Sequence, residues 1–223
     1  MTSNIVLVTA FEPFGGEAVN ASLEAAKGLD GRRCGDAVVA VRTLPCAYDL
    51  CVADLVAACE RLAPRALLMS GQAARRGVLC VERLARNRVS ASRRDSRGAL
   101  GSPAALGPDM LVTTANAAAV ARAVRTAGVA ARVSADAGDY VCNHLYFEAL
   151  RRLGRTSPTV PAIFIHLPAT PAQSPPRANA RRFDSADAMR GLEAAIQAML
   201  RPIRRTDAET PPLGEAAQDA ARS

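Results

Sequence analysis

The residues best suited to chemistry lie in the stretch DAGDYVCNHLYFEAL, residues 136–150, where a glycine-marked loop leads into a segment with a helical pattern. Cys142 stands at this junction, and a helix N-terminus or a nearby base stabilises a thiolate. His166 ends a later apolar segment and is one of two histidines in the chain. A cysteine and a histidine in one site can attack a carbonyl and protonate the leaving amine. The alternative is an ordinary buried thiol.

His144 is a poorer partner for Cys142, because residues two apart on a helix point roughly 200° away from each other. We therefore expect His144 to be a packing or surface residue. The two histidines lack the spacing of a metal-binding pair, and none of the six cysteines forms a CxxC motif. The sequence thus predicts no metal site and no other cofactor.

The charge and the cysteine pattern limit which partners and which compartment we expect for the protein. The formal charge is +7, and Lys27 is the single lysine among the basic residues. Arginines gather in residues 83–98 and 201–205 without interleaved aromatic residues, so a solvated face is expected rather than a nucleic-acid site. The scattered cysteines favour free thiols in a reducing compartment, and no signal peptide or membrane span is recognisable. We expect a soluble cytoplasmic protein with no nucleic-acid or membrane partner.

Apolar runs alternate with amphipathic segments along most of the chain. The expected strands are residues 4–10, 37–44, 65–72, 130–135 and 161–168. The expected helices are residues 20–29, 48–62, 115–128, 142–154 and 186–203. An irregular arginine-rich region reaches to about Gly107. This order predicts one α/β domain, residues 1–203, with a mostly parallel sheet covered by helices on both faces, and a disordered polar tail, residues 204–223.

In such sheets, functional groups gather beyond the carboxyl ends of the strands. The groups expected at this edge are Phe11, Phe14, Cys46, Gln72, Cys142 and His166. If strand 130–135, helix 142–154 and strand 161–168 form one right-handed crossover, Cys142 and His166 lie on the same side of the sheet. The helix dipole and an imidazolium would then lower the pKa of the Cys142 thiol.

Four blocks of sequence carry a family resemblance. TAFEPFGGEAVNAS (9–22), SGQAARRGVLCVERLARN (70–87), SADAGDYVCNHLYFEAL (134–150) and FIHLPATPAQ (164–173) resemble, in order, the blocks of the pyroglutamyl peptidase I (pyrrolidone-carboxylate peptidase) family. The resemblance covers about residues 4–200. It implies a cytosolic cysteine peptidase that removes N-terminal pyroglutamate from peptides, with an α/β/α sandwich fold and a homotetrameric assembly.

The resemblance also implies roles for individual residues. Cys142 matches the nucleophile, His166 the general base and acid, and Glu82 the acidic third member, which would fix the imidazole tautomer. Glu82 could otherwise be a surface glutamate. Asp95 lies where the family carries an acidic residue and is a candidate auxiliary acid.

The substrate's pyroglutamyl ring is a small neutral lactam, so its pocket needs apolar walls and a few hydrogen-bonding groups. Phe11 and Phe14 suit the walls, and a hydrophobic core is their alternative role. The resemblance adds Cys46, Gln72, Tyr140 and Val141. Backbone N–H groups near Cys142 are expected to hold the oxyanion.

The chain departs from the family in its loop RVSASRRDSRGAL, residues 88–100, where Arg93 stands near a position that is apolar in the family. This loop suggests one alternative, a catalytically weakened relative that binds peptides or only assembles. A nucleoside-phosphorylase-like enzyme is a second alternative with a similar outline, but no P-loop or basic trio for phosphate is recognisable.

Overall fold

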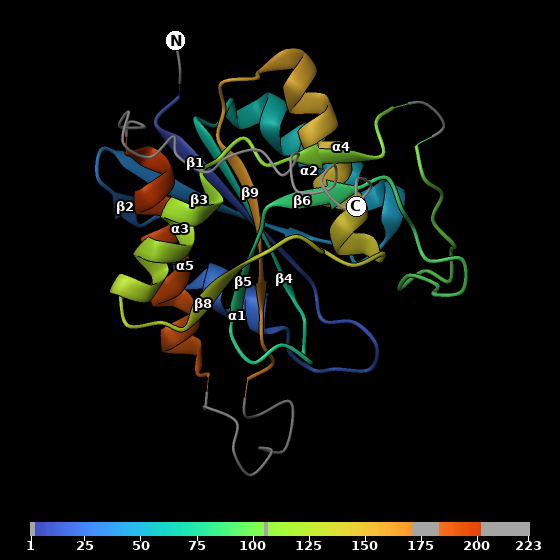
Figure 1. The fold of residues 1–223 in the computed structure, drawn as a ribbon, viewed down its shortest axis with the longest axis horizontal. Helices are drawn as coiled ribbons and strands as arrows, with labels where there is room; N and C mark the ends of the chain where they lie inside the picture. Colours follow the sequence, from blue (N-terminus) through green and yellow to red (C-terminus); the bar gives the residue numbers. More distant parts are fainter. Residues whose placement is uncertain (1–2, 105–106, 171–182, 202–223) are drawn as a thin grey trace, which may run out of the picture.

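A central sheet separates two layers of helices in the computed structural model, which describes residues 3–104, 107–170 and 183–201 (Figure 1). The sheet order is β2-β3-β1-β4-β9-β5-β8. These strands are β1 (Ile5–Phe11), β2 (Arg33–Cys34), β3 (Ala37–Leu44), β4 (Ala66–Gln72), β5 (Leu79–Glu82), β8 (Ala131–Ser134) and β9 (Ala162–Leu167). The predicted tail, residues 204–223, lies outside the described residues.

Helices cover both faces of the sheet, which confirms the predicted α/β/α architecture. One layer comprises α1 (Ala21–Lys27), α3 (Ala117–Thr126) and α5 (Ser185–Leu200), and the other comprises α2 (Tyr48–Leu62) and α4 (Val141–Thr156). A small antiparallel pair, β6 (Leu84–Arg86) and β7 (Met110–Val112), packs beside α4. Among the described helices, none combines the length and apolar character that a membrane span requires.

The continuous apolar run of β1 follows from its central place in the sheet. Val6, Val8 and Ala10 face the α1/α3/α5 layer, whereas Leu7 and Phe11 face the α2/α4 layer. Both faces of β1 are therefore buried, which explains why polar and apolar residues do not alternate along this strand. The same holds for β4 and β9, so the middle of the sheet is a rigid support for the residues at its carboxyl edge.

The sheet is mostly parallel, as predicted, because β3, β1, β4 and β9 run in one direction. The predicted right-handed crossover from strand 130–135 to strand 161–168 is wrong. β5 pairs antiparallel with β9 and parallel with β8, so β8 runs opposite to β9 and is separated from it by β5. The sequence analysis missed β5, a strand of four residues inside the region taken as irregular.

Candidate active site

Cys142 lies in the first turn of α4, on the α2/α4 side of the sheet. Its sulfur packs over Gly71 of β4, because a Cβ atom built on that glycine would stand 3.0 Å from Cys142 Sγ. Gly71 is the register partner of His166 on the neighbouring strand β9. Paired residues of parallel strands share a face of the sheet, so the structure brings the thiol and the imidazole to adjacent positions.

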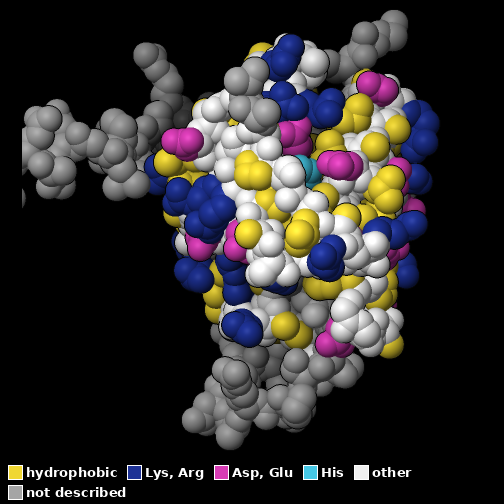
Figure 2. Space-filling view, turned by 90° about the vertical axis from the view of Figure 1, so that its right-hand side faces the viewer, with side chains coloured by type: hydrophobic (Ala, Val, Ile, Leu, Met, Phe, Trp, Pro, Cys, Tyr) yellow, Lys and Arg dark blue, Asp and Glu magenta, His cyan; other side chains and the backbone are white. Residues whose placement is uncertain are grey.

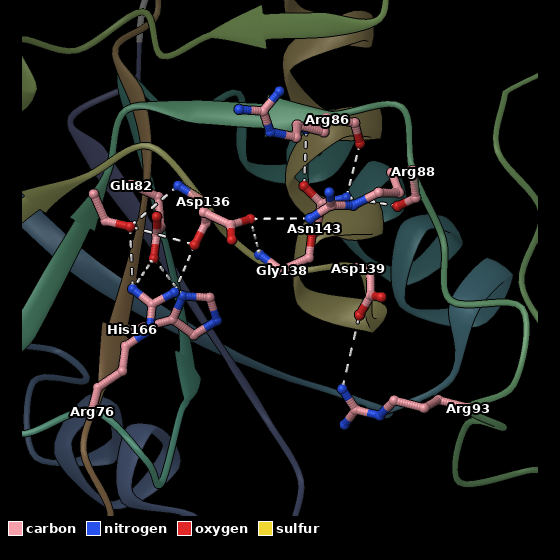
Figure 3. Close-up of polar contacts among 11 residues, drawn as sticks. Arg76, Glu82, Arg86, Arg88, Arg93, Asp136, Gly138, Asp139, Asn143 and His166 are labelled. Carbon is pink, nitrogen blue, oxygen red and sulfur yellow. Dashed lines mark hydrogen bonds and ion pairs between the residues drawn. The ribbon is translucent and has the colours of Figure 1, made fainter.

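His166 is held by a buried carboxylate. Its Nδ1 lies 2.8 Å from Glu82 Oε1, and the Glu82 side chain is fully buried (Figure 3). An ionised carboxylate only accepts hydrogen bonds, so Nδ1 carries the proton and Nε2 is the basic nitrogen. Glu82 reaches this position because β5 pairs with β9 in a register that places Glu82 opposite Phe164, on the same face as His166.

Arg76 contacts the buried carboxylate of Glu82, and the sequence analysis did not single it out. Its Nη1 lies 2.6 Å from the same Glu82 oxygen that binds His166, and its Nη2 donates to the backbone carbonyl of Asp136 at 2.6 Å (Figure 3). Glu82 Oε2 is buried, and no described residue forms a hydrogen bond with it. Because the Glu82 side chain is fully buried, loss of Arg76 would deprive a buried charge of one of its two partners.

Burial sets the electrostatics of the two reacting groups. Burial raises the pKa of the Cys142 thiol, and the nearby Cys46 and Glu82 raise it further, while Arg93 and the backbone N–H of Cys142 oppose this. Burial lowers the pKa of His166, with Glu82 acting in the opposite direction. Both shifts favour the uncharged forms of the two groups, a thiol at Cys142 and an imidazole at His166. The expected acidification of Cys142 is wrong for this state, because desolvation outweighs the helix dipole.

The start of α4 is clamped by Asn143, which the sequence analysis also missed. Its Oδ1 accepts from the N–H of Arg86, and its Nδ2 donates to the carbonyls of Arg86 and Arg88 (Figure 3). Tyr146 adds a second anchor, since its hydroxyl donates to the backbone carbonyl of Glu82 at 2.9 Å. The N-cap residue Tyr140 forms no side-chain cap, which leaves the first-turn N–H groups of α4 available to an oxyanion.

Most of the expected pocket residues belong to, or pack against, the buried cluster that contains Cys142. Phe11, Cys46 and Val141 are buried in the same cluster of side chains, and Phe14 and Tyr140 pack against that cluster half-buried. The rings of Phe14 and Tyr140 lie 6.3 Å apart. Phe11, Phe14 and Cys46 stand at or just beyond the carboxyl ends of β1 and β3, on the side of the sheet that carries Cys142.

Gln72 has a structural contact that the sequence did not predict. Its side-chain oxygen accepts from the N–H of Ala21 at 2.8 Å and so caps α1 together with Asn20, whose side chain accepts from the N–H of Ser22. The side-chain carbonyl of Gln72 is therefore engaged in the fold. Its backbone remains at the carboxyl edge of β4, next to the site.

Asp95 organises the loop of residues 88–98. One of its oxygens accepts from the N–H of Tyr48 at the start of α2, and the other accepts from those of Arg97 and Ala99. Burial alone would raise the pKa of Asp95, but these backbone N–H groups hold it below its ordinary value. All of these bonds go to backbone, so its position suits support of the loop rather than orientation of His166.

A cavity of about 920 Å³ lies at the opposite edge of the sheet and is not this site. It is lined by the C-terminal halves of α2 and α4 and by the turn before β9, and it contains none of the candidate residues. Within the described part of the chain, no group of three His, Cys, Asp or Glu side chains is placed to hold a metal ion.

Comparisons with known proteins agree with this geometry. The profile of the pyroglutamyl peptidase family matches residues 4–202. The chain is 37% identical over 199 residues to a pyrrolidone-carboxylate peptidase of Cupriavidus taiwanensis, covering 87% of this chain and 92% of the relative. A second such peptidase, from Photorhabdus laumondii, is 38% identical over 201 residues, covering 89% of each chain.

Solved structures give the same answer. The crystal structure of Bacillus amyloliquefaciens pyroglutamyl peptidase I superposes with a TM-score of 0.83 at 30% identity, covering 87% of this chain and 96% of that one. The pyrrolidone carboxyl peptidase of Thermococcus litoralis also gives 0.83, at 28% identity, covering 88% and 93%. On the strength of its sequence, its fold and its buried His166–Glu82 pair beside Cys142, this chain belongs to the pyroglutamyl peptidase family.

Proposed function

We propose that this protein is a cysteine peptidase that hydrolyses the amide bond after an N-terminal pyroglutamyl residue. The observation that carries the proposal is the buried His166–Glu82 pair at 2.8 Å, set beside a cysteine in the first turn of a helix. A cysteine nucleophile, a histidine base and a carboxylate that orients the histidine are the parts of an activated nucleophile.

The reaction begins from the neutral pair. As Cys142 Sγ attacks the pyroglutamyl carbonyl carbon, its proton passes to His166 Nε2, and Glu82 stabilises the imidazolium that forms. The first-turn N–H groups of α4 hold the negative oxygen. His166 then protonates the leaving amine, the C–N bond breaks, and an acyl-enzyme remains. Water, deprotonated by His166, releases pyroglutamate and restores the thiol.

The lactam ring suits the surroundings of the thiol. Phe11, Phe14 and Val141 offer apolar walls, and backbone groups at Gln72 can address the amide edge of the ring. A free glutamyl residue would bring an ammonium and a carboxylate into this apolar pocket without partners, at a high desolvation cost. Selectivity for the cyclised residue follows from that cost.

Two finer proposals rest on the family resemblance. We propose a homotetrameric assembly and a cytoplasmic location, where the free cysteines of the described chain stay reduced. Light scattering on the purified protein tests the assembly, and a mass of one chain would contradict it.

The direct test is release of a fluorescent amine from a pyroglutamyl amide by the purified, reduced protein. We expect cleavage by the wild type and none by Cys142→Ala, with the open-chain glutamyl and prolyl amides left intact. Cys59→Ala is the matched control, because this half-buried thiol lies in α2 away from the site and its loss should leave the rate unchanged. A folded wild type that cleaves nothing would favour the catalytically weakened alternative.

A further inference from the structure

The Arg93 side chain lies close to the start of the helix that carries Cys142. The Arg93 guanidinium lies 4.1 Å from the centroid of the Tyr140 ring, and Tyr140 immediately precedes the helix that carries Cys142. The positive charge of Arg93 lowers the pKa values of Cys142 and Cys46, which places it within electrostatic range of the nucleophile. Its side chain is 57% exposed, whereas Cys142 is buried.

Among the residues that the structure describes, the one ionic partner of Arg93 is held loosely. Its Nη1 lies 4.0 Å from Asp139 Oδ1, at the limit of an ion pair (Figure 3). By contrast, Arg88 lies 3.2 Å from Asp136, and Arg94 donates to the carbonyl of Gly98 at 2.7 Å. A carboxylate arriving from solvent can approach Arg93 more closely than Asp139 does and form a charge-assisted hydrogen bond.

The loop around Arg93 strengthens this preference for negative charge. Residues 88–98 contain four arginines and one acid, Asp95, whose oxygens are occupied by backbone N–H groups. Figure 2 shows the side of the molecule on which this loop lies, where basic and acidic side chains are interspersed with exposed apolar surface. The Tyr140 hydroxyl donates to the carbonyl of Arg94 at 2.9 Å, so this loop is held against the residue that precedes the helix of Cys142.

We propose that Arg93 forms a subsite for a carboxylate of the leaving peptide, so that the enzyme favours substrates with an acidic residue directly after pyroglutamate. The inference rests on the proposed peptidase function and adds the substrate class to it. A carboxylate in that place could come from an acidic side chain or from the C-terminus of a dipeptide, and we assign the side chain.

The test compares two C-terminally amidated peptides that differ only in charge, pyroglutamyl-glutamate amide and pyroglutamyl-glutamine amide. Amidation removes the C-terminal carboxylate, and free-acid pyroglutamyl-glutamine measures its separate effect. We expect kcat/KM of the wild type to be about three- to tenfold higher for the glutamate peptide. The ratio should approach one in about 1 M salt, where the Debye length falls to about 3 Å.

Variants identify the residue responsible. Arg93→Gln should bring the ratio close to one and Arg93→Lys should keep part of it, whatever happens to the absolute rates, because any change at the nucleophile affects both peptides alike. Asp139→Asn removes the internal competitor and should raise the ratio. Arg97→Gln is the matched control, an exposed arginine of the same loop that should leave the ratio unchanged.

The outcomes separate the two proposals. A wild type that cleaves both peptides at equal kcat/KM, or an Arg93→Gln variant that keeps the full ratio, overturns the subsite and leaves the peptidase function intact. A preference seen only for the free-acid dipeptide also overturns it, since the C-terminus would then be the ligand. A folded wild type that cleaves neither peptide overturns the peptidase function and the subsite together.

Discussion

The two sides of Cys142 are built differently. On the sheet side, Arg76, Glu82 and His166 are joined at 2.6 and 2.8 Å, and the carboxylate between them is fully buried. On the loop side, Arg93 lies 4.0 Å from Asp139 and is more than half exposed. Buried polar groups are costly unless their geometry is fixed, whereas exposed charges change at little cost. The comparison fits the proposed roles, with the chemistry on the rigid side and substrate preference on the adaptable side.

Removing the carboxylate should break the rigid side most severely. Glu82→Gln keeps the volume of the side chain but loses the charge that stabilises the imidazolium and fixes its tautomer. We expect kcat to fall roughly 10²- to 10⁴-fold. Steady-state kinetics on a pyroglutamyl amide measures the loss, with the exposed Glu60→Gln as a surface control. A kcat near the wild-type value would mean that Glu82 does not orient His166.

The position of the sulfur is the next most sensitive feature. In Gly71→Ala, the new Cβ would stand 2.9 Å from Phe164 Cζ and 3.0 Å from Cys142 Sγ, so one of them must move. We expect a loss of about 1–3 kcal/mol in stability and a fall in kcat/KM of about 10- to 100-fold. Thermal unfolding and kinetics check both values.

Gly154→Ala is the matched control for that substitution. Gly154 lies within α4, and a Cβ there meets nothing within 4 Å, so alanine should keep the activity and slightly stabilise the helix. Equal kinetics for the two alanine variants would show that the sulfur has room to shift without losing its alignment.

The sequence predicted the rigid side in part. Strands β1, β4 and β9 were recognisable because both of their faces are buried, and β3 was recognisable by its apolar run, although it is partly exposed. Their shared direction placed Gln72 and His166 at one edge. Glu82 was identified by resemblance alone. The strand that carries it, β5, has only four residues, and Glu82 and His166 are 84 residues apart in the sequence. The direction of β5 depends on tertiary pairing, which no local pattern reports.

Electrostatic roles were harder to predict than positions. Arg76 resembled its exposed arginine neighbours in the sequence, and only the pairing of β5 turns Glu82 toward it. The predicted acidification of Cys142 considered the helix dipole but not the burial that opposes it. Gln72 and Asp95 have suitable polar side chains, but contacts distant in sequence commit them to capping α1 and α2. Burial and long-range partners decide such roles.

Arg76 offers a subtler way to disturb the rigid side. Its positive charge lowers the pKa of His166, so Arg76→Gln should raise that pKa and move the acid limb of kcat/KM to higher pH. The buried Glu82 loses a partner as well, which should cost about 3 kcal/mol of stability and about tenfold in kcat. Arg76→Lys should restore the wild-type limb in part. If kcat/KM instead fell by the same factor at every pH, the role of Arg76 would be structural.

The smallest effect is expected for Asp95, which holds the arginine-rich loop of residues 88–98 in place. Asp95→Asn replaces one accepting oxygen by a donor, so either the bond to Tyr48 or the bonds to Arg97 and Ala99 are lost. We expect KM for pyroglutamyl peptides to rise a few-fold with kcat nearly unchanged, and stability to fall by about 1 kcal/mol. The Glu-to-Gln peptide ratio should fall as well, because Arg93 loses its fixed position. If kcat instead fell as steeply as in Glu82→Gln, Asp95 would belong to the chemistry, and the division between a rigid catalytic side and an adaptable loop would be wrong.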